Sequence, residues 1–145
     1  MAFRFSLATV LRVRESLERN EERALQKIQL AMAHLAHQID ELTSKIVKLH
    51  EAREKTLQQP ISASHLHMLL EDATSAAEQK KSLIENLHLL EQQRDQQILR
   101  YQAAHRDRET LTDLSDNQKD AYEQDQLRAQ QRVLDDIFMA RRHQS

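Results

Sequence analysis

Histidine is the residue in this chain whose chemistry first suggests a site. Eight histidines are spread over 145 residues, and imidazole is a common metal ligand and proton carrier near neutral pH. His34, His37 and Glu41 are spaced i, i+3 and i+7, so on a helix they share an outward face that could bind a transition metal weakly. Zinc sites need three or four converging ligands with a fixed second layer of hydrogen bonds. We therefore favour a solvated polar face.

Two further histidines, His65 and His67, are two residues apart and point to different sides of a helix, so we expect surface residues or contacts to a partner.

The composition removes most routes to catalysis. The chain has no Gly and no Cys, which excludes a glycine-rich phosphate loop and a cysteine nucleophile. The carboxylate pairs Glu21-Glu22 and Asp135-Asp136 are adjacent and diverge around a helix. The composition does not exclude a Ser-His-Asp catalytic arrangement, but a helical rod offers no enclosed pocket that would exclude water. We expect no enzyme, no catalytic residue, and no cofactor or metal site.

The charges and apolar runs narrow the class of partner. Net charge is -2, from 21 basic and 23 acidic residues that are interspersed, whereas a nucleic-acid binder usually carries a basic face. No apolar run approaches the roughly 20 residues that span a bilayer. The absence of Cys fits a reducing compartment. We expect a cytoplasmic protein with no nucleic-acid partner and no transmembrane segment, attached to the membrane only peripherally.

Strong helix formers dominate the composition, and their pattern predicts an all-α protein. Between residues 25 and 49, apolar side chains are spaced alternately three and four apart, which is a coiled-coil seam. The seam consists of Leu25, Ile28, Met32, Leu35, Ile39, Leu42, Ile46 and Leu49. Leu7 and Leu11 continue it towards the N-terminus, but Arg14, Glu18 and Glu21 occupy the positions between, where we expect looser packing.

The lone proline, Pro60, predicts the bend. Proline disfavours helix at the preceding residue and cannot donate within a helix, and Ser62 or Ser64 can cap the helix that follows. We expect one unit over residues 1–145, with a first helix at about 6–58, a bend at about 59–63 and a second helix at about 64–141. The run Thr110–Asn117 is poor in helix propensity and could bend or fray the second helix.

A more polar seam marks the second helix, and it pairs with the first in an antiparallel register. The seam runs through Leu66, Leu69, Ala73, Ala76, Lys80, Leu83, Leu87, Leu90, Arg94, Gln97, Tyr101, Ala104, Arg108 and Leu111. Paired residue numbers that sum to about 122 align the two seams and place the bend beside Pro60. At three positions this register places an unfavourable pair of side chains opposite each other in the seam. These pairs are Leu42 with Lys80, Ile28 with Arg94 and Arg14 with Arg108.

This register leaves the end of the second helix without an intramolecular partner. Phe3 lies opposite about residue 119, so roughly the last 25 residues overhang by about 35–40 Å. The overhang still carries an apolar stripe of Leu127, Leu134, Ile137 and Phe138, flanked by Val133 and Met139. Exposed contiguous apolar surface usually marks an interaction site. The expected fold is a long two-helix antiparallel coiled-coil hairpin with an overhanging C-terminal helix that needs a partner.

The basic amphipathic start of the chain, with Arg4, Arg12 and Arg14 among apolar residues, has two interpretations. It is either a contact for an anionic membrane surface or acidic protein channel, or an ordinary helix start that continues the seam.

Both ends of the chain resemble the flagellar export protein FliJ family. The opening, Phe3-Arg4-Phe5-Ser6-Leu7-Ala8-Thr9-Val10-Leu11-Arg12, is similar to that family's start of alternating Phe and basic residues followed by a Val-Leu-x-x-Arg segment. The run Gln130-Gln131-Arg132-Val133-Leu134-Asp135-Asp136 resembles its Gln-Lys-x-Leu-Asp-Glu segment, with Arg132 for Lys and Asp136 for Glu.

The resemblance implies a stalk similar to the rotor stalk of rotary ATPases. Such a stalk binds the hexameric flagellar export ATPase, the membrane export-gate protein and export chaperones, and so aids flagellum assembly and motility. The ATPase-facing residues it implies are Phe3, Phe5, Leu7, Leu11, Leu134, Asp135, Ile137, Phe138 and Arg141. The gate-facing body would include Leu42, Leu49, Leu69 and Ala76. Two alternatives stay open, namely the equivalent stalk of a virulence type III secretion system and a purely structural, self-associating coiled coil.

Overall fold

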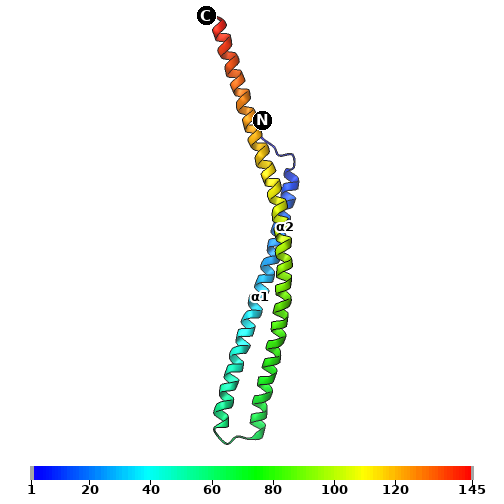
Figure 1. Cartoon of the computed structure of the whole chain (residues 1–145), viewed down its shortest axis with the longest axis vertical. Helices are drawn as coiled ribbons and strands as arrows, with labels where there is room; N and C mark the ends of the chain where they lie inside the picture. The colour runs from blue at the N-terminus through cyan, green and yellow to red at the C-terminus, as the bar shows by residue number, and fades with distance from the viewer. Residues whose placement is uncertain (1, 145) are drawn as a thin grey trace. The chain divides into compact units, whose positions relative to one another are not determined.

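Two long helices account for nearly all of the chain. The computed structural model describes residues 2–144, in which α1 spans Ala8–Leu57 and α2 spans Ala63–Gln144. The helices pack against each other in antiparallel fashion (Figure 1), and no strand occurs among these residues. The prediction of an all-α helical hairpin is confirmed.

The helix pair divides into two compact units. One consists of the chain up to Glu21 together with the chain from Tyr101 onwards, and the other spans Glu22–Arg100. Each unit contains a segment of α1 and a segment of α2. We call them the terminal unit and the bend unit, and describe each by itself.

The residues nearest the helix interface follow the predicted seams. In the bend unit, every seam position predicted on α1 from Leu25 to Leu49, and on α2 from Leu66 to Gln97, is less exposed than its neighbours on the outer faces. Only Ala76, at 2% exposed, and Gln97, at 6%, are fully buried among the described residues. Two helices cannot enclose more, because each seam side chain has a partner on one side only.

The connection between the helices contains Pro60 and lies between Leu57 and Ala63. The last turn of α1 closes with short-range bonds, from the Gln58 amide to the Lys55 carbonyl (3.3 Å) and from the Gln59 amide to the Thr56 carbonyl (3.2 Å). Ser62 then caps α2, because its Oγ accepts a hydrogen bond from the His65 amide at 3.2 Å. The serine therefore satisfies one of the amides that lack a partner at a helix start.

Two local features differ from expectation. Helix α1 begins at Ala8, two residues later than expected, and the Ala8 amide bonds to the Phe5 carbonyl at 3.2 Å. Helix α2 passes through Thr110–Asn117 without interruption. Within that run, the hydroxyls of Thr110 and Thr112 donate to the carbonyls four residues earlier, at 2.8 and 3.0 Å. These bonds let the polar side chains stay within the helix instead of competing with it.

Candidate functional site

The end of α2 in the terminal unit is exposed throughout its described residues. All 22 residues from Glu123 to Gln144 are exposed, and they form about 33 Å of helix. In Figure 1 this C-terminal segment continues beyond the N-terminal end as a single helix. We call residues 123–144 the overhang. An isolated helix of this length is marginal in water, so most of its stability must come from its continuity with α2 or from a partner.

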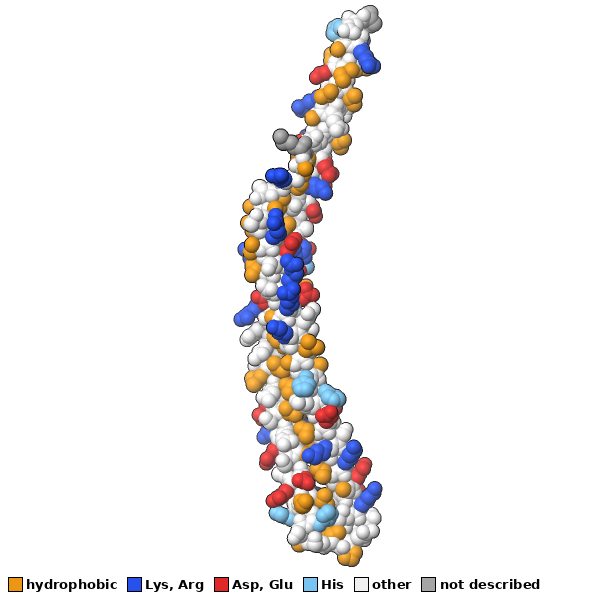
Figure 2. All heavy atoms as spheres, turned by 180° about the vertical axis from the view of Figure 1, so that it is seen from behind, with side chains coloured by type: hydrophobic (Ala, Val, Ile, Leu, Met, Phe, Trp, Pro, Cys, Tyr) orange, Lys and Arg blue, Asp and Glu red, His pale blue; other side chains and the backbone are white. Residues whose placement is uncertain are grey.

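The overhang exposes large apolar side chains around much of the circumference of the helix. Their exposed fractions run from 46% for Ile137 to 69% for Phe138, and hydrophobic atoms are visible along the C-terminal end in Figure 2. The full set is Leu127, Val133, Leu134, Ile137, Phe138 and Met139. A shallow depression lies on this surface, between Gln126 and Leu134. The apolar face is wider than the narrow seam of a two-stranded coil, which suits a partner that contacts the helix from more than one direction.

Phe3 and Tyr122 close the paired part of the terminal unit. Their ring centroids are 5.7 Å apart with planes at 44°, within the range of favourable aromatic pairs. The Tyr122 hydroxyl also accepts a bond from the Gln126 side-chain amide at 3.1 Å. The sequence predicted Phe3 opposite about residue 119, so the observed pair lies one helical turn further along α2. The overhang is therefore slightly shorter than expected.

The terminal unit contains all the residues that the resemblance assigned to the ATPase-facing end. Phe3, Phe5 and Leu11 are half-buried, while Leu7 is 38% exposed. The other members belong to the overhang, and all of them are exposed: Leu134, Asp135, Ile137, Phe138 and Arg141. Phe3 thus contacts Tyr122 at the base of the overhang, whereas the C-terminal residues lie along the exposed overhang itself.

A polar layer crosses the seam of the terminal unit, where the sequence predicted loose packing. Arg108 Nε donates to Glu18 Oε2 at 2.6 Å, and His105 Nδ1 lies 3.0 Å from Glu18 Oε1. The Glu18 side chain is only 16% exposed. The hydrogen bond from Arg108, followed by that from His105, holds the pKa of Glu18 below its ordinary value.

The predicted unfavourable contact between Arg14 and Arg108 is avoided, because each arginine pairs with a carboxylate. Arg14 bonds to Asp107 at 3.3 Å, while Arg108 turns to Glu18. The seam spacing alone could not predict these ion pairs, because it assigns each residue a single residue directly opposite and ignores diagonal neighbours. A search for opposite charges would have found both pairs, because Glu18 lies one turn from Arg14 and Asp107 lies one residue from Arg108.

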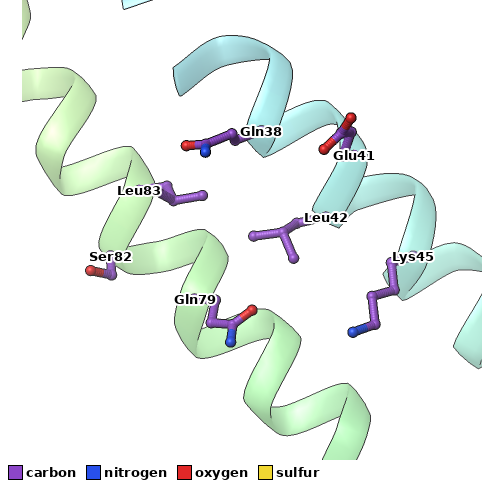
Figure 3. A pocket seen from close by; sticks show the side chains of 7 residues that line it. All are labelled: Gln38, Glu41, Leu42, Lys45, Gln79, Ser82 and Leu83. Carbon is purple, nitrogen blue, oxygen red and sulfur yellow. The ribbon is translucent and has the colours of Figure 1, made fainter. Parts of the chain in front are cut away.

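In the bend unit, the residues assigned to the gate-facing body differ in exposure. Leu42, Leu49 and Leu69 are half-buried, but Ala76 is 2% exposed and its side chain is unavailable to a partner. Figure 3 shows Leu42 pointing between the helices, with Leu83 and Gln79 facing it from α2. The apolar side chains that are exposed near the connection are others, which sequence reasoning missed: Val47, Leu57, Met68 and Leu70.

Two of the histidines singled out in the sequence, His37 and His67, pair with carboxylates one turn away on the same helix. His37 Nε2 lies 2.9 Å from Glu41, and His67 Nε2 lies 2.9 Å from Glu71. Over residues 2–144, no three side chains of His, Cys, Asp or Glu converge as a metal site would require. Within the same range, neither helix has a stretch long and apolar enough to cross a bilayer.

The family of this chain follows from its match to a family model. A family model described as Flagellar FliJ protein matches residues 3–145. The chain belongs to this family. Neither the curated proteins nor the solved structures compared with it give a match.

Membership in the FliJ family confirms the resemblance found in the sequence, and the match includes both Phe3 and the overhang. It supports a role related to flagellar protein export, with interactions among components of that export apparatus. FliJ is a structural family rather than a known enzyme family.

Proposed function

We propose that this FliJ protein is the stalk and adaptor of the flagellar export apparatus, and that its overhang enters the central hole of the hexameric export ATPase. The observation that carries the proposal is the overhang itself, 22 consecutive exposed residues with six large apolar side chains. A ring presents several copies of one surface around a hole, so an apolar face wider than a single seam fits it better than a flat partner. The Phe3–Tyr122 pair sets the base of the inserted segment.

A pair of leucines on α2 offers a matched test. Leu134 in the overhang is 65% exposed, and Leu99 in the bend unit is 64% exposed. An aspartate at either site should leave the helix formed, because neither side chain is in a core. We expect Leu134→Asp to weaken binding to the purified ATPase hexamer by about tenfold or more, as for a central apolar contact. Leu99→Asp should leave the affinity unchanged.

A truncated chain provides a second test of ATPase binding. A chain that ends at Gln126 keeps the paired part of the terminal unit but loses every apolar residue of the overhang. It should fail to co-purify with the ATPase hexamer and fail to stimulate ATP hydrolysis. Equal retention of the full-length and truncated chains would contradict the proposal, as would equal effects of the two leucine substitutions.

The bend unit is the proposed contact for the membrane export gate and for export chaperones. Four apolar side chains near the connection are 40–58% exposed, and they are Val47, Leu57, Met68 and Leu70. The half-buried Leu42, Leu49 and Leu69 can add to this contact only the part of each side chain that is exposed to solvent. Attachment to the cytoplasmic side of the membrane would then be peripheral and would depend on the gate. Replacing Met68 and Leu70 by serine should reduce gate binding while ATPase binding stays intact.

Self-association is the second candidate, because the same apolar face could pack against a second copy of the chain. Sedimentation equilibrium separates the two functions. A monomer at micromolar concentration favours the stalk, whereas a stable dimer that Leu134→Asp dissociates favours a structural coiled coil. A stalk of a virulence secretion system has the same geometry, and binding to flagellar rather than virulence ATPase rings would distinguish the two systems.

A further inference from the structure

A half-buried ion pair joins the two helices of the terminal unit at a seam position of each. Arg108 Nε donates to Glu18 Oε2 at 2.6 Å, and the two side chains are only 25% and 16% exposed. His105 Nδ1 lies 3.0 Å from the other carboxylate oxygen of Glu18. Removing one partner of such a pair leaves an uncompensated charge in the seam, which is strongly destabilising. Any alignment of the helices that separates Glu18 from Arg108 is therefore disfavoured.

The apolar seam of the bend unit does not select one alignment by itself. A seam repeats every seven residues, so sliding α2 by one heptad brings seam positions opposite each other again. In such a shifted register, Leu42 would lie opposite Ala73 and no longer opposite Lys80, and Ile28 would lie opposite Leu87. Polar residues of α2 would then face only one of the seam positions from 25 to 49, whereas the register predicted from the sequence places them opposite three. On apolar contacts alone, the shifted register is the better one.

The connection between the helices is also compatible with the shifted register. Helix α2 would then begin near Pro60, and proline is well tolerated in the first turn of a helix, where its missing N–H has no partner to lose. Ser62 would no longer accept the His65 amide, which is the loss of a single hydrogen bond. Neither the proline nor the cap is therefore sufficient to exclude the shift.

The terminal unit, in contrast, fits only the observed register. After the shift, Arg108 would face Leu11, and Glu18 would face Tyr101, one heptad before its present partner. No carboxylate would take the place of Glu18, because the first fourteen residues of the chain contain neither Asp nor Glu. The nearest carboxylate, that of Glu15, would lie one turn further along α1. Both members of the half-buried ion pair would thus lose their opposite charge.

We propose that the Glu18–Arg108 pair is a register lock, which selects the observed alignment of the helices and thereby sets the length of the overhang. In the shifted register, the residue opposite each position of α1 lies one heptad earlier on α2, so the exposed end of α2 would be about 10 Å longer. Polar residues within an apolar seam fix the register of coiled coils in this way, at some cost in stability. The lock acts within the hairpin and does not depend on which partner the overhang binds.

The distance between two spin labels in the terminal unit, measured by electron paramagnetic resonance, tests the lock. The chain has no Cys, so Ser16→Cys and Asp120→Cys, both at exposed positions, label α1 and α2 at one site each. The natural pair should give one distance. In the variant Glu18→Leu with Arg108→Leu, both registers place apolar side chains at these positions, so the helices should stay paired. We expect this variant to show a second population with a distance about 10 Å longer.

Two further variants separate a choice of register from a loss of stability. Reversing the pair, with Glu18→Arg and Arg108→Glu, should restore the single natural distance, because the opposite charges again meet only in that register. Ser62→Ala removes the cap at the connection and should leave the distance unchanged. A single natural distance in the double leucine variant would overturn the proposal, as would a second population caused by Ser62→Ala alone. If the double leucine variant aggregates, Glu18→Gln with Arg108→Gln decides by the same measurement and criterion.

Discussion

The ring of Phe3 lies 5.7 Å from the ring of Tyr122, and beyond this contact every described residue of α2 is exposed. The pair joins a segment that is not helical, ahead of α1, to a point 119 residues later in the chain. Aromatic pairs of this kind contribute about 0.5–1.5 kcal/mol beyond the burial of their area. Phe3 thus sets where the paired terminal unit ends and where the overhang begins.

Replacing Phe3 by Ala should loosen the end of the terminal unit. We expect amide protection at residues 2–10 and around Tyr122 to fall by about two- to tenfold, as the loss of one aromatic pair implies. The control is Phe138→Ala, because Phe138 is 69% exposed and its loss should leave protection near Tyr122 unchanged. Hydrogen exchange measured by mass spectrometry resolves both regions, and unchanged protection in the Phe3 variant would show that the pair is unimportant.

Acid should weaken the terminal unit through Glu18. Arg108 and His105 lower the pKa of this carboxyl from its ordinary value of 4.5. A lowered pKa in the paired state means that Glu18 stabilises the pairing fully above about pH 4.5, and that this stabilisation is lost as pH falls through the lowered pKa. Helix pairing at residues 8–21 should therefore weaken in this window.

The variant Glu18→Gln checks the assignment of the acid effect. It removes the titrating group while keeping the size of the side chain, so pairing should be weaker at pH 6 and less sensitive to acid below pH 4.5. Glu22→Gln, at an exposed position of α1, is the control and should retain the natural acid profile. Identical acid profiles in the natural and Glu18→Gln chains would show that other carboxylates dominate.

Ser62 should stabilise the start of α2 in the bend unit. Its Oγ accepts the His65 amide at 3.2 Å, and loss of such a cap typically costs about 1 kcal/mol. Ser62→Ala should lower the free energy of unfolding of the chain by about that amount in urea titrations. Ser64→Ala, two residues later on the exposed first turn, should change it by less than about 0.5 kcal/mol. Equal effects of the two substitutions would refute the cap.

Ala76 is a small residue buried at the helix interface of the bend unit. Ala76 is 2% exposed, whereas the adjacent Ala77 is exposed. Leucine at position 76 must push the helices apart, at a cost of about 1–3 kcal/mol. Leucine at position 77 should be nearly neutral. Thermal unfolding followed by circular dichroism distinguishes them, and equal melting temperatures would mean that the seam is loose at this point.

Apolar spacing in the sequence determined the two helices, the bend at Pro60 and which side chains face the interface. These features are local, because periods of three and four residues fix a helix face and a proline fixes a break. The seam positions from Leu25 to Leu49 are all less exposed than the outer faces, as the spacing predicts. The motifs at the two ends were also sufficient to indicate the FliJ family, which the family comparison confirms.

Tertiary structure alone decided the polar contacts and the end of the paired region. Seam spacing paired Arg14 with Arg108, but long charged side chains reach diagonally across an interface, and Arg108 bonds to Glu18 while Arg14 bonds to Asp107. The Phe3–Tyr122 contact lies one turn from its expected place, because residues ahead of Ala8 leave the helix and no longer advance by 1.5 Å each. Helical periodicity carries no information about such diagonal and non-helical contacts, so only the folded chain could reveal them.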